Sequence, residues 1–184
     1  MEALEPMQTS RLLAVLIICL LTAVPLHAQK QQREPLTADQ QDKIAEAGVD
    51  PNERVALYTK YINEHADVIQ RLIKRAEQGR DQRIDSELQD FSALLDELDS
   101  NLDIYGDRKA DIRASLKPLN ESIQRWKRIL TDLPSRPGFQ VSRDDAIDAC
   151  KDLADQASQL IVDLSNYFEE HKDEKGQDRA EPKE

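Results

Sequence analysis

The chain has 184 residues, a net charge of −11 at neutral pH, and 33% charged but only 4% aromatic residues. This length suffices for one domain with its own core, and the composition is more typical of amphipathic helices than of a β-sandwich. Acidic residues are spread along the whole chain and no long basic block occurs. This pattern argues against binding to nucleic acid or to an anionic membrane surface.

The N-terminal region has the features of an export signal. Arg11 precedes an apolar run from Leu12 to Val24, and the small residue Ala28 precedes Gln29. A positive flank, a short apolar run and a small residue at the cleavage point are typical of a secretory signal peptide. The run is shorter than the ~20 residues of a membrane-spanning helix. We therefore predict a signal peptide over residues 1–28, a periplasmic or secreted protein, and no stable membrane span after cleavage.

A polar stretch and a short helix follow the signal segment. Residues 29–36 are polar and have no apolar period, which predicts a flexible leader. Thr37 and Gln40 have the spacing of a capping box, and Gly48 is typical of a helix end. The sequence therefore predicts a short helix between residues 37 and 48.

Four longer segments carry apolar residues at alternating spacings of three and four, which predicts amphipathic helices. The first begins with Asp50, Pro51 and Glu53, a pattern typical of a helix start. The last is introduced by Ser142, which we predict to be its N-cap because Asp145 follows three residues later. The apolar stripes run from Val55 to Ala76, from Ile84 to Tyr105, from Ile112 to Leu133 and from Ala146 to Tyr167.

Because each segment has one apolar stripe, the four stripes must be buried against one another. The simplest arrangement is an antiparallel up-down-up-down four-helix bundle over residues 37–171, followed by a disordered charged tail over residues 172–184. The stripe keeps its phase from Ile84 to Leu133, so one continuous helix in an elongated coiled coil is the alternative. Gly106 and the polar Lys109 favour a turn there.

The helix start from Asp50 to Arg54, with Tyr58 shortly after it, resembles that of uncharacterised exported bacterial α-helical proteins. The resemblance implies export and an all-helical fold. It brings no activity, cofactor or ligand with it.

Residues able to bind metal or to perform catalysis are few. Carboxylate-bridged metal sites in helical bundles use Glu-x-x-His, and neither His65 nor His171 has a Glu three positions before it. The rise of a helix places His65, Cys150 and His171 at different heights, so they cannot share one ion. We therefore predict no catalytic, cofactor or metal site. We interpret His65 as an apolar-stripe residue bonded locally, and His171 as a partner of a helix C-terminus.

Cys150 is the only cysteine outside the predicted signal segment. It lies in phase with Ala146 and Leu153, which predicts a buried core residue of low reactivity. The alternative is an intermolecular disulfide that joins two chains in a homodimer.

These observations favour a non-enzymatic exported protein that binds another macromolecule in the bacterial envelope or outside the cell. Pro118, inside the third long segment, should kink its helix. We expect the loop over residues 133–141 to expose Phe139 and Val141, and we interpret these two residues and Pro118 as a candidate partner surface. A small-ligand carrier or sensor with a pocket inside the bundle is the alternative function.

Overall fold

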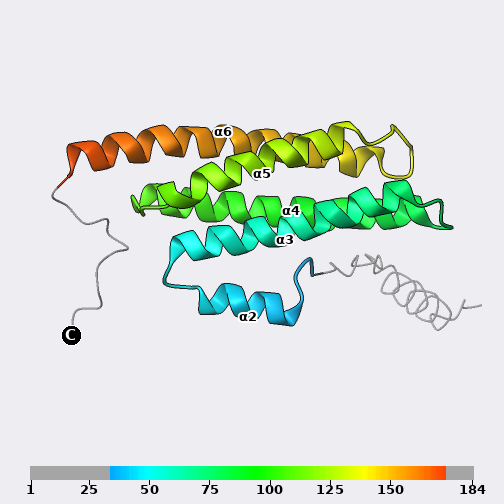
Figure 1. The fold of residues 1–184 in the computed structure, drawn as a ribbon, viewed down its shortest axis with the longest axis horizontal. Helices are drawn as coiled ribbons and strands as arrows, with labels where there is room; N and C mark the ends of the chain where they lie inside the picture. The colour runs from blue at the N-terminus through cyan, green and yellow to red at the C-terminus, as the bar shows by residue number, and fades with distance from the viewer. Residues whose placement is uncertain (1–33, 173–184) are drawn as a thin grey trace, which may run out of the picture. The chain divides into compact units, whose positions relative to one another are not determined.

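The computed structural model describes residues 34–172 of the chain. Its helices are α2 (Ala38–Glu46), α3 (Pro51–Lys74), α4 (Arg80–Asp107), α5 (Arg113–Thr131) and α6 (Gln140–Glu170) (Figure 1). No strand occurs in this part of the chain, so the predicted all-α class is confirmed. Among its helices, none is long and apolar enough to cross a membrane. The signal segment, residues 29–33 of the leader and residues 173–184 of the tail lie outside the described residues.

Local capping contacts explain where α2 and α3 begin. The hydroxyl of Thr37 accepts from the backbone N–H of Gln40, and the Gln40 side chain accepts from the backbone N–H of Thr37, so the predicted capping box is confirmed. The carboxylate of Asp50 accepts from the backbone N–H groups of Asn52 and Glu53 at 2.9 and 3.3 Å. Such caps typically stabilise a helix by about 0.5–2 kcal/mol.

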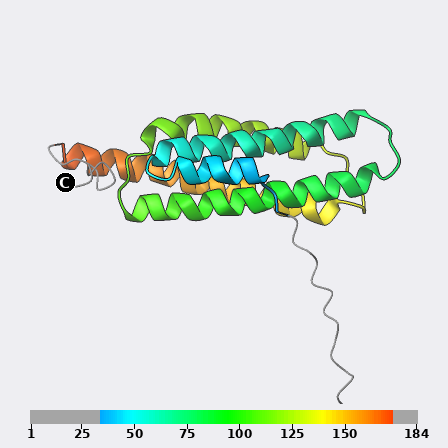
Figure 2. The same cartoon turned by 90° about the horizontal axis from the view of Figure 1, so that it is seen from below.

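The four long helices pack in a ring in which α3 contacts α4 and α5, and α6 contacts the same two. Ser115 of α5 donates to Asn52 near the start of α3, and Trp126 near the end of α5 donates to Asn63 farther along α3. These two pairs show that α3 and α5 run in the same direction. The consecutive helices α4 and α5 therefore occupy opposite corners of the ring, which Figures 1 and 2 let the reader follow.

The second parallel pair is α4 with α6. Ser142 near the start of α6 donates to Asp85 near the start of α4, and Gln156 donates to Asp103 farther along. Both contacts are short, at 2.6 Å. Ser142 therefore lies inside α6 and its side chain binds α4 through this hydrogen bond. The prediction that it is the N-cap was wrong. The helix begins at Gln140, directly after Phe139.

The chain turns between α4 and α5 and does not continue as one helix. Lys109, the polar residue that interrupts the predicted stripe, has a left-handed φ of 55°. The backbone N–H of Ala110 donates to the carbonyl of Tyr105 at 2.9 Å and closes the turn. Gly106 lies in the last turn of α4, where a Cβ would come within 2.7 Å of a methyl group of Leu160 on α6. A residue without a side chain therefore permits the close approach of these two helices.

The four predicted apolar stripes supply the core. Phe91 of α4 and Trp126 of α5 meet edge to face with their ring centroids 5.8 Å apart, across the diagonal of the ring. The indole N–H of Trp126 donates to Asn63, and the hydroxyl of Tyr58 donates to Glu97. Trp126 and Tyr58 therefore fill part of the interior while their polar atoms reach partners at its edge.

Candidate functional site

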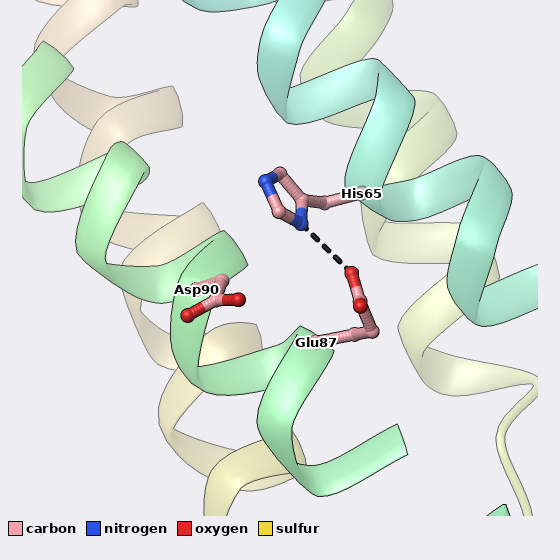
Figure 3. A group of neighbouring side chains, drawn as sticks. All are labelled: His65, Glu87 and Asp90. Carbon is pink, nitrogen blue, oxygen red and sulfur yellow. Dashed lines mark hydrogen bonds and ion pairs between the residues drawn. The ribbon is translucent and has the colours of Figure 1, made fainter. Parts of the chain in front are cut away.

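His65 joins α3 to two other parts of the molecule (Figure 3). Its Nδ1 lies 2.9 Å from Oε2 of Glu87 on α4, and its Nε2 lies 3.1 Å from the carbonyl oxygen of Pro35, before α2. The interpretation of His65 as a locally bonded residue of the apolar stripe was therefore wrong. At this level the buried position of α3 belongs to Ala66, so His65 points sideways, toward α4.

Glu87 and Asp90 bring two carboxylates to the same place. They are three residues apart on α4, so they lie on one face of that helix, opposite His65 (Figure 3). Ligand atoms of His65, Glu87 and Asp90, one from each, all lie within 4.8 Å of one another. Asp90 is buried, and the side chains of His65 and Glu87 are only 15% and 16% exposed. Three side chains of the types that bind metal ions therefore converge.

This cluster was missed in the sequence because its pattern is Glu-x-x-Asp and its histidine comes from another helix. The sequence does contain a signal for it. If α3 and α4 pair as an antiparallel hairpin around residues 75–79, then Tyr58 lies opposite Glu97, as is observed. The same register places His65 opposite Glu87 and Asp90.

A surface hollow of about 490 Å³ lies beside the cluster. The segment before α2 forms one wall, and α3 and α4 form the others; Figure 2 shows α2 alongside α3. Leu36 is buried and Pro35 contacts His65, so the prediction of a flexible leader through residue 36 was wrong for these residues. The lining residues are Glu34, Pro35, Leu36, Thr37, Gln40, Glu64, His65, Val68, Arg71, Glu87 and Asp90.

The charges around the hollow are mostly negative. Four carboxylates line it, whereas Arg71 and His65 are the basic groups among its described lining residues. Burial lowers the pKa of His65, but the hydrogen bond and charge of Glu87, the carbonyl of Pro35 and the charge of Asp90 together raise the pKa above its ordinary value. This environment therefore stabilises positive charge at the imidazole.

Two groups beside the hollow that could take part in catalysis, His65 and Thr37, already contact other protein groups. A general base needs a ring nitrogen that can reach a substrate proton, and both nitrogens of His65 contact protein acceptors. The hydroxyl of Thr37, a potential nucleophile beside the hollow, accepts the capping hydrogen bond of α2. Carboxylates and an imidazole at close range are groups that attract cations.

The structure differs from the predicted partner surface in the positions of its residues. Phe139 is 1% exposed, so the expectation that the loop displays it was wrong. It lines a small cavity together with Ile73, Ile84 and Pro134. Val141 is 72% exposed, as expected, but it belongs to the first turn of α6.

Pro118 is exposed on α5, and the helix continues on both sides of it. Helices α5 and α6 run antiparallel, because Arg143 near the start of α6 donates to the carbonyl of Leu130 near the end of α5. Pro118 near the start of α5 and Val141 at the start of α6 therefore lie toward opposite ends of this pair. The structure does not bring them together into one surface.

Cys150 and His171 lie away from the hollow, on α6 and at its end. Cys150 is fully buried, as predicted, and burial raises the pKa of its thiol to about 12. An intermolecular disulfide at Cys150 would therefore require the helices to separate. His171 Nδ1 lies 2.8 Å from the carbonyl oxygen of Tyr167, in keeping with the predicted contact at a helix C-terminus.

Comparisons with known proteins give no relative from which to transfer a role: no family model, curated protein or solved structure matches the chain.

Proposed function

We propose that this chain is an exported, non-enzymatic helical protein that binds a basic segment of another macromolecule in the bacterial envelope or outside the cell. Its four long helices act as an up-down-up-down bundle that serves as a rigid scaffold. The acidic hollow between α3, α4 and the segment before α2 is the binding site. The observation that carries this proposal is the convergence of four carboxylates on one hollow.

These carboxylates come from three different parts of the described chain, the segment before α2 (Glu34), α3 (Glu64) and α4 (Glu87 and Asp90). Like charges held close together repel one another, and a bound cation relieves that repulsion. The chain's net charge of −11 adds a long-range attraction for basic partners. Charge complementarity therefore supports a lysine- or arginine-containing segment as the ligand.

The walls of the hollow are tied together by side-chain contacts. The Gln40 side chain on α2 donates to Glu64 on α3 at 3.0 Å, and the Gln41 side chain donates to Glu34 at 2.8 Å. His65 adds the contact to Pro35. A site whose walls are held in place loses less entropy when it binds a partner. Because aromatic side chains occupy the bundle interior, we place the ligand here and not inside the bundle.

Export is supported by the sequence pattern of residues 1–28. The non-enzymatic part of the proposal is supported by the protein contacts that His65 and Thr37 already make, to Glu87 and Pro35 and to the backbone of Gln40.

The proposal is tested by calorimetric titration of the full chain with a short peptide of alternating lysine and alanine. Replacing Glu34 and Glu64 together by Gln removes two charges from the hollow and keeps the side-chain size. We expect the affinity to fall by about tenfold, equivalent to about 1.4 kcal/mol. The matched control replaces Asp145 and Asp155 by Asn, because both are exposed on α6 and the same two charges are lost.

The control variant should bind the peptide nearly as the unmodified chain does. Equal weakening in both double variants would mean that the peptide responds to total charge and not to the hollow, and the proposal would be wrong.

A further inference from the structure

We propose that His65, Glu87 and Asp90 form a binding site for a divalent transition-metal ion such as Zn²⁺, with Nδ1 of His65 and one oxygen of each carboxylate as the ligands. This inference goes beyond the binding of a basic segment, because it assigns a separate ligand to the inner end of the hollow. It rests on three side chains, none of which is Glu34 or Glu64.

The orientation of His65 is that of a metal ligand. Its Nε2 lies 3.1 Å from the carbonyl oxygen of Pro35, a geometry in which Nε2 carries a hydrogen and donates it. Histidine ligands almost always donate their other ring N–H to a carbonyl or carboxylate in this way, which fixes the tautomer and aims the remaining nitrogen at the metal. The remaining nitrogen, Nδ1, points at the carboxylate of Glu87 (Figure 3).

Both ring nitrogens of His65 face oxygen acceptors, and a neutral imidazole has a single N–H to offer them. Nδ1 of a neutral imidazole with a hydrogen on Nε2 carries a lone pair, and Oε2 of Glu87 is also electron-rich at 2.9 Å from it. In that tautomer, a proton or a metal ion bound at Nδ1 makes the contact with Glu87 favourable. A proton meets this need in the absence of metal, and a metal ion meets it with the same two groups as ligands.

Asp90 supplies the third ligand from one turn farther along α4. Zn²⁺ holds nitrogen and oxygen ligands at ~2.0–2.2 Å, which places the ligands of a tetrahedral ion about 3.4 Å apart. The pair of Nδ1 and Glu87 Oε2 at 2.9 Å would open slightly, and ligand atoms that are now up to 4.8 Å apart would move closer. Three protein ligands leave the fourth position of a tetrahedral ion for water from the hollow.

The donor set indicates the class of ion. An imidazole nitrogen is a good ligand for Zn²⁺ and neighbouring transition metals, whereas Mg²⁺ and Ca²⁺ prefer sites made of oxygen alone. The three side chains are mostly shielded from water, which strengthens their hold on a cation. We therefore expect Zn²⁺ to bind more tightly here than Mg²⁺ or Ca²⁺.

The test uses the full chain, treated with a chelator and titrated with ZnCl₂ by calorimetry, with the visible spectrum of Co²⁺ as a report on coordination. We expect one ion per chain and a rise in melting temperature with Zn²⁺. The variants Glu87→Gln and Asp90→Asn preserve size and should each lower the affinity by more than about tenfold. His65→Gln should do the same and should remove the nitrogen-dependent part of the Co²⁺ spectrum.

The controls are Glu64→Gln, which changes the same hollow outside the cluster, and His171→Gln, which removes the other histidine of the described region. Both should bind Zn²⁺ as the unmodified chain does, and circular dichroism should show all five variants to be folded. The inference is overturned if the unmodified chain shows no saturable Zn²⁺ binding, or if Glu87→Gln and Asp90→Asn bind as tightly as the controls. Peptide binding without Zn²⁺ binding would contradict the metal site and leave the proposed function unaffected.

Discussion

Nδ1 of His65 lies 2.9 Å from Oε2 of Glu87, and this contact joins α3 to α4 where both side chains are mostly shielded from water. The other ring nitrogen of His65 contacts the carbonyl of Pro35, so the same side chain also holds the segment before α2. Shielded hydrogen bonds to charged groups contribute more to stability than exposed ion pairs do. His65 is therefore expected to matter for stability as well as for binding.

Replacing His65 by Ala should lower the free energy of unfolding by about 1.5–3 kcal/mol, because hydrogen bonds that involve charged groups contribute in this range. Urea denaturation in the presence of a chelator measures the change. Hydrogen exchange should show faster opening of α2 in the variant, because its anchoring contact is lost. His171→Ala is the matched control, and an equally large loss in that variant would contradict the special role of His65.

Substitutions of Phe139 and Val141, which the sequence predicted to lie on one partner surface, should change the stability of the fold by different amounts. Phe139→Ser should destabilise the fold by about 3–5 kcal/mol, since it removes a large buried side chain. Val141→Ser should change stability by no more than about 0.5 kcal/mol, because Val141 is exposed. Thermal and urea unfolding measure both, and a stable Phe139→Ser variant would show that the packing at the end of this loop is different.

The buried indole N–H of Trp126 has the side chain of Asn63 as its hydrogen-bond acceptor. The Asn63 side-chain oxygen accepts from the Trp126 indole N–H and from Arg125, each at 2.8 Å. Asn63→Ala should cost about 1–3 kcal/mol in the unmodified chain, because the indole N–H then has no acceptor. It should cost clearly less in a Trp126→Phe background, which lacks that donor.

Circular dichroism is the suitable readout for this double-mutant cycle, since Trp126 is the only tryptophan of the chain. Equal costs of Asn63→Ala in the two backgrounds would mean that the hydrogen bond does not contribute to stability.

Cys150 should make stability fall at high pH. Burial raises the pKa of its thiol to about 12 in the folded state, whereas an unfolded cysteine has a pKa of about 8.5. Below about pH 8.5 the thiol is protonated in both the folded and the unfolded state, so its contribution to the free energy of unfolding is complete. Above that pH the free energy of unfolding falls by about 1.4 kcal/mol per pH unit, until the thiol of the folded state also ionises. Between pH 8 and pH 10, the unmodified chain should therefore lose about 2 kcal/mol more stability than Cys150→Ala.

Urea titrations at the two pH values measure this difference. A thiol reagent provides a second check, because Cys150 should react only after unfolding. Rapid reaction with the folded chain, or a disulfide-linked dimer on a non-reducing gel, would contradict a buried thiol.

The parts of the fold that depend on local sequence could be predicted. Thr37 and Asp50 cap their helices through contacts within three residues, so their patterns are complete in the sequence. Ser142 shows the limit of the same rule. Its spacing to Asp145 is that of a capping box, but α6 begins two residues before it, at Gln140, and Ser142 contacts Asp85 on another helix. A local pattern does not reveal which tertiary contact competes with it.

The candidate site depends on contacts that no local pattern contains. Glu87 lies 22 residues after His65, and Pro35 lies 30 residues before it. The first separation follows from an antiparallel pairing of α3 with α4, so it was within reach of sequence reasoning. The second depends on how the segment before α2 folds back along α3, and a polar segment without an apolar period gives no sign of that path.

The most direct test of the acidic hollow as a binding site is a titration of the ¹⁵N-labelled protein with the lysine–alanine peptide, followed by NMR chemical shifts. We predict that the largest changes fall on backbone amides within residues 34–40, 64–71 and 87–90, the three stretches that contain the lining residues of the hollow. Pro35 has no backbone N–H and gives no signal. Changes spread evenly over the acidic surface, or concentrated around Val141 and Pro118, would contradict this assignment.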